Sequence, residues 1–306
     1  MLLATVAVTT TTGGRWTAPL LLLLLLLLDA GGVLAQDARA WYKANPGMVR
    51  IRRVNQATNQ IVDDFGRTRF FHGTNVVMKE APWHRPAAWK PGTPSFGAQD
   101  VRNLRDLGLN VVRLGHSWAG AEPTARGRYN ETFLEIMRRQ TKLAEDHGLY
   151  VLVDVHQDCL ARQFCGHGVP DWFARKDWVS SWLRYPFPLN KLRPFPVDGD
   201  GFPTPPSVCG SVDWALSYTS VALSNAFGRL YRNDDGLADA FAAYWQRLAS
   251  GYAGARNVVG YNLLNEPLRT YAPDNRTLAL FTASGVRAAT EISVTVTRKG
   301  PPREAL

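Results

Sequence analysis

The feature that most constrains the fold of this chain is a short apolar segment, residues 258–264, which ends at Asn265-Glu266-Pro267. Short runs of this kind are typical of parallel strands that are covered on both faces. Pro267 cannot donate to a strand ladder, so we expect the strand to end there. In folds built on parallel strands, active sites lie at the carboxyl ends of the strands. Glu266 is therefore the first candidate for a catalytic residue, although a solvated glutamate in a turn would give the same tripeptide.

Polar side chains also follow three earlier apolar runs. Residues 69–77 lead to Lys79, residues 109–112 end at Arg113, and residues 150–153 are followed by Asp154, His156 and Asp158. Each of these side chains alone has a structural alternative, such as an arginine paired to a structural carboxylate or a histidine in the core. Chance would rarely place polar clusters after four such runs. We therefore predict neighbouring parallel strands whose carboxyl ends share one rim, with Glu266 and His156 on the same side.

Helical periodicity separates these strands. Residues 97–108 place Val101, Leu104 and Leu107 on one face, and residues 130–147 form a longer amphipathic segment that Asn130 can cap. Residues 237–252 show the same period. Alternating strands and helices with short links predict an α/β fold around a parallel sheet.

The first 35 residues have the features of a signal peptide. Arg15 supplies a positive charge, residues 20–28 are nine consecutive leucines, and Ala35 ends a small-residue cleavage site. The apolar core is shorter than the ~20 residues that span a bilayer, which makes a membrane anchor the alternative. Two sequons, at Asn130 and Asn275, fit an export route. We expect a protein that is secreted or reaches the endolysosomal lumen.

Three cysteines in an oxidising compartment leave one outside any internal disulfide. We favour a Cys165–Cys209 disulfide, which would anchor a long insertion, residues 160–212, rich in proline, glycine and aromatic residues. Such a loop is usually a lid or a binding wall. A zinc site formed by the cysteines with His156 or His167 is an alternative, but paired ligand spacings are absent from the sequence. The sequence predicts no metal and no cofactor.

The formal net charge of +9 raises the question of a nucleic-acid partner. The basic residues are scattered and form no recognition helix, so nucleic acid is not expected. Affinity for an anionic membrane surface is the milder inference, and it suits a lipid-linked or sialylated substrate. The sequence also contains neither a glycine-rich phosphate loop nor a Gly-x-Ser-x-Gly elbow.

Taken together, these motifs resemble those of glycoside hydrolase family 5, and within it the endoglycoceramidases. The resemblance covers roughly residues 50–270. It rests on Gly73-Thr74-Asn75 with Lys79, Val112-Arg113-Leu114-Gly115 with Trp118, Glu122-Pro123, Tyr129-Asn130-Glu131-Thr132, Asp154-Val155-His156-Gln157-Asp158, residues 164–172 and Asn265-Glu266-Pro267.

The resemblance implies an eight-stranded (β/α)8, or TIM, barrel and a role for each matched residue. Glu266 becomes the acid/base, Asn265 contacts the sugar beside the scissile bond, and Arg113 supports the nucleophile. The sugar-binding residues become Lys79, His156 and Asp158. A retaining glycosidase of this kind also needs a second carboxylate about 5–5.5 Å from the first.

We could not assign that nucleophile. The later carboxylates are Asp274, Glu291 and Glu304, and none ends a convincing apolar strand. Because a complete barrel takes ~250 residues, the sequence predicts one truncated after about its fourth strand. The expected catalytic domain is residues 36–297, followed by a disordered tail, residues 298–306. On this interpretation the chain alone should release no oligosaccharide.

Three hypotheses about function remain at this stage. The first is a secreted retaining β-glycosidase that cleaves between oligosaccharide and ceramide in glycosphingolipids. The second is another family 5 β-glycosidase, acting on glucosylceramide, a steryl glucoside or a β-glucan. The third is a non-catalytic sugar-binding remnant that lacks the nucleophile. The sequence does not predict the oligomeric state.

Overall fold

The computed structural model describes residues 49–174, 196–211, 218, 220–267, and the chain divides into two units at residues 69 and 70. The predicted leader and tail, Asn275, and the carboxylates Asp274, Glu291 and Glu304 lie outside the described residues. So do the aromatic residues of the insertion from 175 to 195.

The described part of the first unit contains an antiparallel hairpin that the sequence analysis did not predict. Its strands are β1 (Ile51–Asn55) and β2 (Gln60–Asp63). The buried Asp63 carboxylate accepts hydrogen bonds from the backbone N–H groups of Phe65 and Arg67 and from the Arg67 side chain. These local bonds hold the turn that follows β2.

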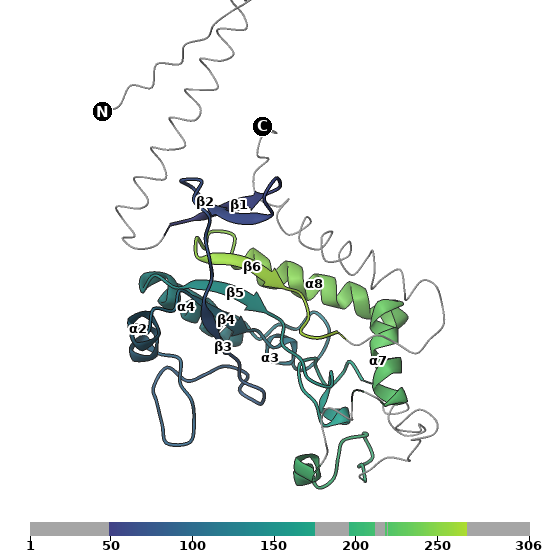
Figure 1. Ribbon diagram of the computed structural model, residues 1–306. Coiled ribbons are helices and arrows are strands. Elements are labelled where there is room, and N and C mark those ends of the chain that lie inside the picture. Colours follow the sequence, from purple (N-terminus) through teal and green to yellow (C-terminus); the bar gives the residue numbers. More distant parts are fainter. Residues whose placement is uncertain (1–48, 175–195, 212–217, 219, 268–306) are drawn as a thin grey trace, which may run out of the picture. The chain divides into compact units, whose positions relative to one another are not determined.

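The second unit is built on a parallel sheet, which in the described residues has four strands (Figure 1). In spatial order they are β3 (Gly73–Val76), β4 (Val111–Gly115), β5 (Tyr150–Asp154) and β6 (Val258–Asn262). Gly115 lies opposite Asp154, and Asp154 lies opposite Asn262, so the strands end in register. The predicted order and direction of the strands are confirmed, although β3 is shorter than the run 69–77 suggested.

The longer helices of the described residues are α2 (Ala98–Asp106), α4 (Glu131–Asp146), α7 (Val221–Tyr231) and α8 (Leu237–Ser250), and a short helix, α3 (Trp118–Ala121), follows β4. All of the longer helices except α7 follow the sequence pattern. Asn130 caps α4 as expected, since its side-chain oxygen accepts from the Phe133 N–H at 3.1 Å. Helix α7 was not predicted from the sequence. The 3-10 helices are η1 (Arg162–Phe164), η2 (Pro206–Ser211) and η3 (Asp234–Gly236).

The core lies between the sheet and the helices. Val112, Leu114, Val151 and Val153 are buried from β4 and β5. Trp118 stacks on Tyr244 of α8, with ring centroids 5.7 Å apart, and meets Trp172 edge-on. The aromatic cluster therefore joins the helix after β4 to α8 and to the start of the insertion.

The prediction that Leu107 faces the core is wrong, because this residue is 75% exposed. Helix α2 ends at Asp106, so Leu107 is its C-cap and leaves the inward stripe.

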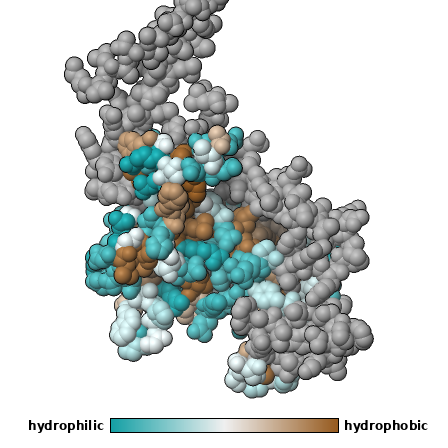
Figure 2. All heavy atoms as spheres, in the orientation of Figure 1, coloured by the Kyte–Doolittle hydropathy of each residue, from teal (hydrophilic) through white to brown (hydrophobic). Residues whose placement is uncertain are grey.

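On the visible face apolar residues are interspersed with hydrophilic ones (Figure 2), as is normal for protein surfaces. Among the described residues, none of the helices has the length and apolar character needed to cross a membrane.

His116, directly after β4, is a buried histidine with a strong consequence for stability. Its Nε2 lies 2.6 Å from the Tyr252 hydroxyl and its Nδ1 lies 2.9 Å from the Leu114 carbonyl. Burial lowers its pKa from the ordinary 6.5 to about 4. The unfolded chain therefore binds a proton below pH 6.5 that the folded chain refuses until about pH 4.

We expect the free energy of unfolding to fall as the pH drops from 6.5 to 4, with His116 contributing at most about 3 kcal/mol of the loss. Urea unfolding at several pH values measures this effect. The slope should be shallower in His116→Gln and unchanged in His72→Gln, which alters an exposed histidine. Equal slopes in the two variants would contradict the assignment.

Candidate active site

The predicted polar residues meet at the carboxyl end of the sheet. Lys79 follows β3, Arg113 belongs to β4, Asp154 ends β5 and precedes His156 and Asp158, and Asn265 and Glu266 follow β6. Hydrogen bonds link these segments across the sheet, including one from the Asn265 backbone N–H to the Val155 carbonyl at 3.0 Å. Glu266 and His156 therefore belong to the same edge, as predicted.

The buried Asp154 carboxylate organises the centre of this edge. It accepts hydrogen bonds from Arg113 at 2.7 Å and from Asn262 at 2.9 Å, and its second oxygen lies 2.9 Å from Nδ1 of His156. The same Arg113 nitrogen donates to the Asn265 side-chain oxygen at 2.8 Å. Arg113 thus has a structural carboxylate as its partner and also orients the residue beside Glu266.

A second cluster gathers around Asp158. One of its oxygens lies 2.6 Å from the Lys79 ammonium, 2.8 Å from Nε2 of His167 and 3.6 Å from Nε2 of His156. The two imidazole rings stack with centroids 5.7 Å apart. His167 comes from the insertion and was not among the predicted sugar-binding residues, although it lies in one of the motifs that carried the resemblance.

The charges of this cluster shift its titration. Burial raises the pKa of the Asp158 carboxyl, but its contacts with His156, His167 and Lys79 outweigh burial and hold the pKa well below its usual range. Burial lowers the pKa of His156, yet Asp154 and Asp158 together raise it above its ordinary value. Burial dominates at His167 and lowers its pKa. Asp158 is therefore an anionic acceptor at neutral pH.

Among the described residues, His156, Asp158 and His167 form the group that can hold a metal ion, with ligand atoms within 4.8 Å of one another. The zinc alternative built on cysteines is wrong in its ligands, because Cys165 is bonded to Cys209. The Lys79 ammonium also lies on the Asp158 carboxylate, where it would repel a dication. The same donors and acceptors suit the hydroxyl groups of a sugar.

The disulfide that the sequence favoured is present. Cys165 and Cys209 have Cα atoms 5.2 Å apart, and Cys159 is buried and takes no part in the bond. The disulfide ties the first part of the insertion to η2, so the described ends of the insertion are held next to each other.

The side chain of Glu266 is exposed in the described structure, and its backbone is left-handed, at φ 40°. The physical reason is the turn that follows β6: its backbone carbonyls point inward to Gln157. Non-glycine residues rarely adopt this conformation unless their surroundings hold them in it, and such residues cluster at functional sites.

Gln157 holds this turn and was missed by the sequence analysis. Its fully buried amide donates to the carbonyl oxygens of Asn265 at 2.6 Å and Glu266 at 3.1 Å. Its side-chain oxygen accepts from the Leu160 N–H, and its backbone carbonyl accepts from the Asn265 side chain. Only its position between His156 and Asp158 could have drawn attention to it.

We expect Gln157→Leu to lower the free energy of unfolding by about 1–3 kcal/mol, because buried carbonyl groups lose their donor. Urea unfolding measures the change. Gln99→Leu, a change at an exposed residue of α2, is the control and should stay within about 0.5 kcal/mol. A Gln157 variant as stable as this control would show that the turn does not depend on the amide.

The fold and this site define a class: an α/β protein whose parallel strands carry, at their carboxyl ends, a carboxylic acid and donors and acceptors that suit sugar hydroxyl groups. The model of the cellulase family, glycosyl hydrolase family 5, matches residues 71–296. The chain belongs to glycosyl hydrolase family 5, and its four described parallel strands are part of a (β/α)8 barrel.

Similar proteins narrow the comparison. An endoglycoceramidase of Cyanea nozakii is 42% identical over 214 residues, which are 70% of this chain and 41% of that protein. An endoglycoceramidase of Hydra vulgaris is 39% identical over 215 residues, 70% of this chain and 40% of that protein. The solved structure of endo-glycoceramidase II from Rhodococcus sp. is 25% identical with a TM-score of 0.54, covering 76% of this chain and 47% of that one. The chain thus spans about two fifths of the length of these curated relatives.

Proposed function

We propose that this protein is a retaining β-glycosidase that releases the oligosaccharide from the ceramide of glycosphingolipids. The observation that carries the proposal is the cluster of Lys79, His156, His167 and Asp158 beside the strand end that bears Glu266. It is supported by the similarity to two proteins named endoglycoceramidase. The substrate is a glycolipid, and an anionic membrane surface is part of the same proposal.

Glu266 is the proposed general acid, which protonates the oxygen of the leaving ceramide and later activates water. Its exposed carboxyl and the turn held by Gln157 present it at the strand end. The nucleophilic carboxylate stays unassigned, because the later carboxylates considered from the sequence lie outside the described residues.

Sugar binding is assigned to the Asp158 cluster. The anionic Asp158 accepts hydrogen bonds from hydroxyl groups, and the Lys79 ammonium donates. His156 is fixed through Nδ1 by Asp154, so its Nε2 faces the sugar side. Asn265, oriented by Arg113, offers an amide next to Glu266.

Secretion is also proposed, through cleavage of residues 1–35. The Cys165–Cys209 disulfide supports this, since such bonds persist in oxidising compartments. Asn130 is exposed and uses its side-chain oxygen for the cap of α4. Its amide nitrogen, the atom to which a glycan is attached, is not part of that bond.

The test uses this chain extended by the remaining strands of the barrel, since the chain alone is expected to release no oligosaccharide. It is offered a glycosphingolipid with a tetrasaccharide headgroup, glucosylceramide, a steryl glucoside and a β-glucan. We expect intact tetrasaccharide and ceramide as products, with retained anomeric configuration in the first NMR spectra. Preferred cleavage of one of the single-sugar lipids or of the glucan would favour the second hypothesis. Sugar binding without turnover on any substrate would favour the non-catalytic one and overturn the proposal.

A further inference from the structure

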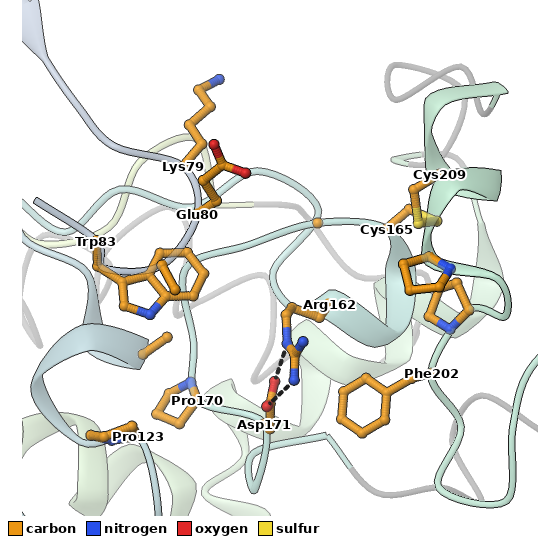
Figure 3. A pocket seen from close by; sticks show the side chains of 15 residues that line it. Lys79, Glu80, Trp83, Pro123, Arg162, Cys165, Pro170, Asp171, Phe202 and Cys209 are labelled. Carbon is orange, nitrogen blue, oxygen red and sulfur yellow. Dashed lines mark hydrogen bonds and ion pairs between the residues drawn. A yellow bond between two sulfur atoms is a disulfide. The ribbon is translucent and has the colours of Figure 1, made fainter. Parts of the chain in front are cut away.

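A cavity of about 650 Å³ lies between the segment after β3 and the insertion (Figure 3), and Lys79 of the Asp158 cluster lines it. Its volume falls in the range of about 300–1,000 Å³ that is typical of ligand sites. Of the proposed site residues only Lys79 lines it. The cavity is therefore a neighbour of the candidate active site with its own walls.

Aromatic rings and prolines form much of the wall. Trp83 and Pro123 lie on one side, and Phe202 and the Cys165–Cys209 disulfide lie on the other (Figure 3). The Trp83 and Phe202 side chains are half-buried. Flat apolar surfaces of this kind suit the C–H faces of sugar rings, as they suit other ligands with one apolar and one polar side.

Between these walls lies an ion pair. The Arg162 guanidinium bonds the Asp171 carboxylate with two nitrogens, one of them at 2.8 Å, and lies over the Phe202 ring, 4.8 Å from its centroid. Both side chains are partly exposed, 55% for Arg162 and 39% for Asp171. Together they present donors and acceptors to the cavity at fixed positions, because the fork geometry and the ring hold the guanidinium.

The charge of the cavity favours a neutral ligand. Its cations are Lys79, which pairs with Asp158, and Arg162, which pairs with Asp171. Two carboxylates, Glu80 and Asp171, balance them in the wall. The walls of the cavity therefore carry no net charge, although the whole chain carries +9. The cavity has no electrostatic preference for an anionic sugar.

Lys79 connects the two sites. Its ammonium bonds Asp158, and its side chain lines the cavity while remaining 60% exposed. We infer that a chain of sugars bound at Asp158 continues past Lys79 and that this cavity receives the outer, neutral sugars of the glycan, with Phe202 and Trp83 as stacking surfaces and the Arg162–Asp171 pair as the hydrogen-bonding partner. The inference rests on the proposed function, because it assigns the inner sugars to Asp158.

The test measures binding of lactose, lacto-N-neotetraose and sialyllactose to the full chain by titration calorimetry. We expect the neutral tetrasaccharide to bind about tenfold more tightly than lactose. Phe202→Ala should reduce this preference severalfold while leaving the lactose affinity unchanged. Phe70→Ala, a change at an exposed ring outside the cavity, is the matched control and should leave both affinities unchanged.

A second variant shows whether a loss of binding in Phe202→Ala comes from the cavity or from a folding defect. Arg162→Gln with Asp171→Asn removes both charges of the partly exposed pair and should also lower the preference for the tetrasaccharide. An unchanged preference in both variants would overturn the inference, and so would tighter binding of sialyllactose than of the tetrasaccharide. If the inference fails in this way but the chain still binds lactose, and Asp158→Asn weakens that binding, the proposed function stands. A chain that binds none of the three sugars would overturn both proposals.

Discussion

Replacement of Arg113 with alanine is expected to lower the free energy of unfolding by about 3–5 kcal/mol, since it removes the cationic partner of a buried carboxylate. The Asp154 side chain has no exposed surface, and Arg113 is its nearest cation, at 2.7 Å. Asn262 and His156 remain as partners, but Asn262 carries no charge. The same change removes the Arg113 donor from the Asn265 side-chain oxygen, while the Asn265 amide nitrogen keeps its bond to the Gln157 carbonyl.

Chemical denaturation at neutral pH measures this loss. Arg139→Ala is the matched control, because Arg139 forms an ion pair with Glu135 on the surface of α4 and its side chain is 76% exposed. Exposed pairs of this kind contribute roughly 0–1 kcal/mol. If the Arg113 variant lost no more stability than the control, Asp154 would not depend on the arginine, and its role at the centre of the site would need another explanation.

In the chain extended by the remaining strands of the barrel, replacement of Glu266 with glutamine is expected to slow hydrolysis of a glycosphingolipid by about 10²–10⁴-fold, the usual contribution of a general acid. Glutamine keeps the size of the side chain but has no proton to give to the leaving oxygen. The backbone of residue 266 should keep its position, because Gln157 binds the carbonyl oxygens and not the side chain. Rates are measured on the glycolipid and on an aryl glycoside with a good leaving group.

The comparison of the two substrates separates acid catalysis from a structural effect. An aryl leaving group departs with little need for a proton, so the first step should suffer less on that substrate. Glu131→Gln on the exposed start of α4 is the control and should leave both rates unchanged. An equal loss on both substrates would indicate that glutamine disturbs the site, and an unchanged rate would remove Glu266 from the mechanism.

Local sequence patterns predict much of the fold. The apolar runs at 109–112, 150–153 and 258–264 became β4, β5 and β6, because short, uniformly apolar segments must be covered on both faces. The start of α4 followed from Asn130, since capping depends only on neighbours three residues away. The end of α2 was harder to place, and a difference of a residue at its C-cap moved Leu107 from the core to the surface.

What the sequence by itself determined is the order of the parallel strands, the polar rim at their ends and the family, because each depends on local patterns or on motifs. The Cys165–Cys209 pairing was favoured from the sequence, but it joins residues 44 positions apart and was decided by the structure. Only the tertiary structure decided which rim residues touch. Arg113 meets residues 41 and 152 positions away, and His167 returns from the insertion to Asp158. The tertiary structure also decided that Glu266 is exposed, that Gln157 bonds the turn after β6, and that a cavity lies at Phe202. The physical reason is that hydrogen bonds and ion pairs act over a few ångströms in space, whereas a sequence pattern records only distance along the chain.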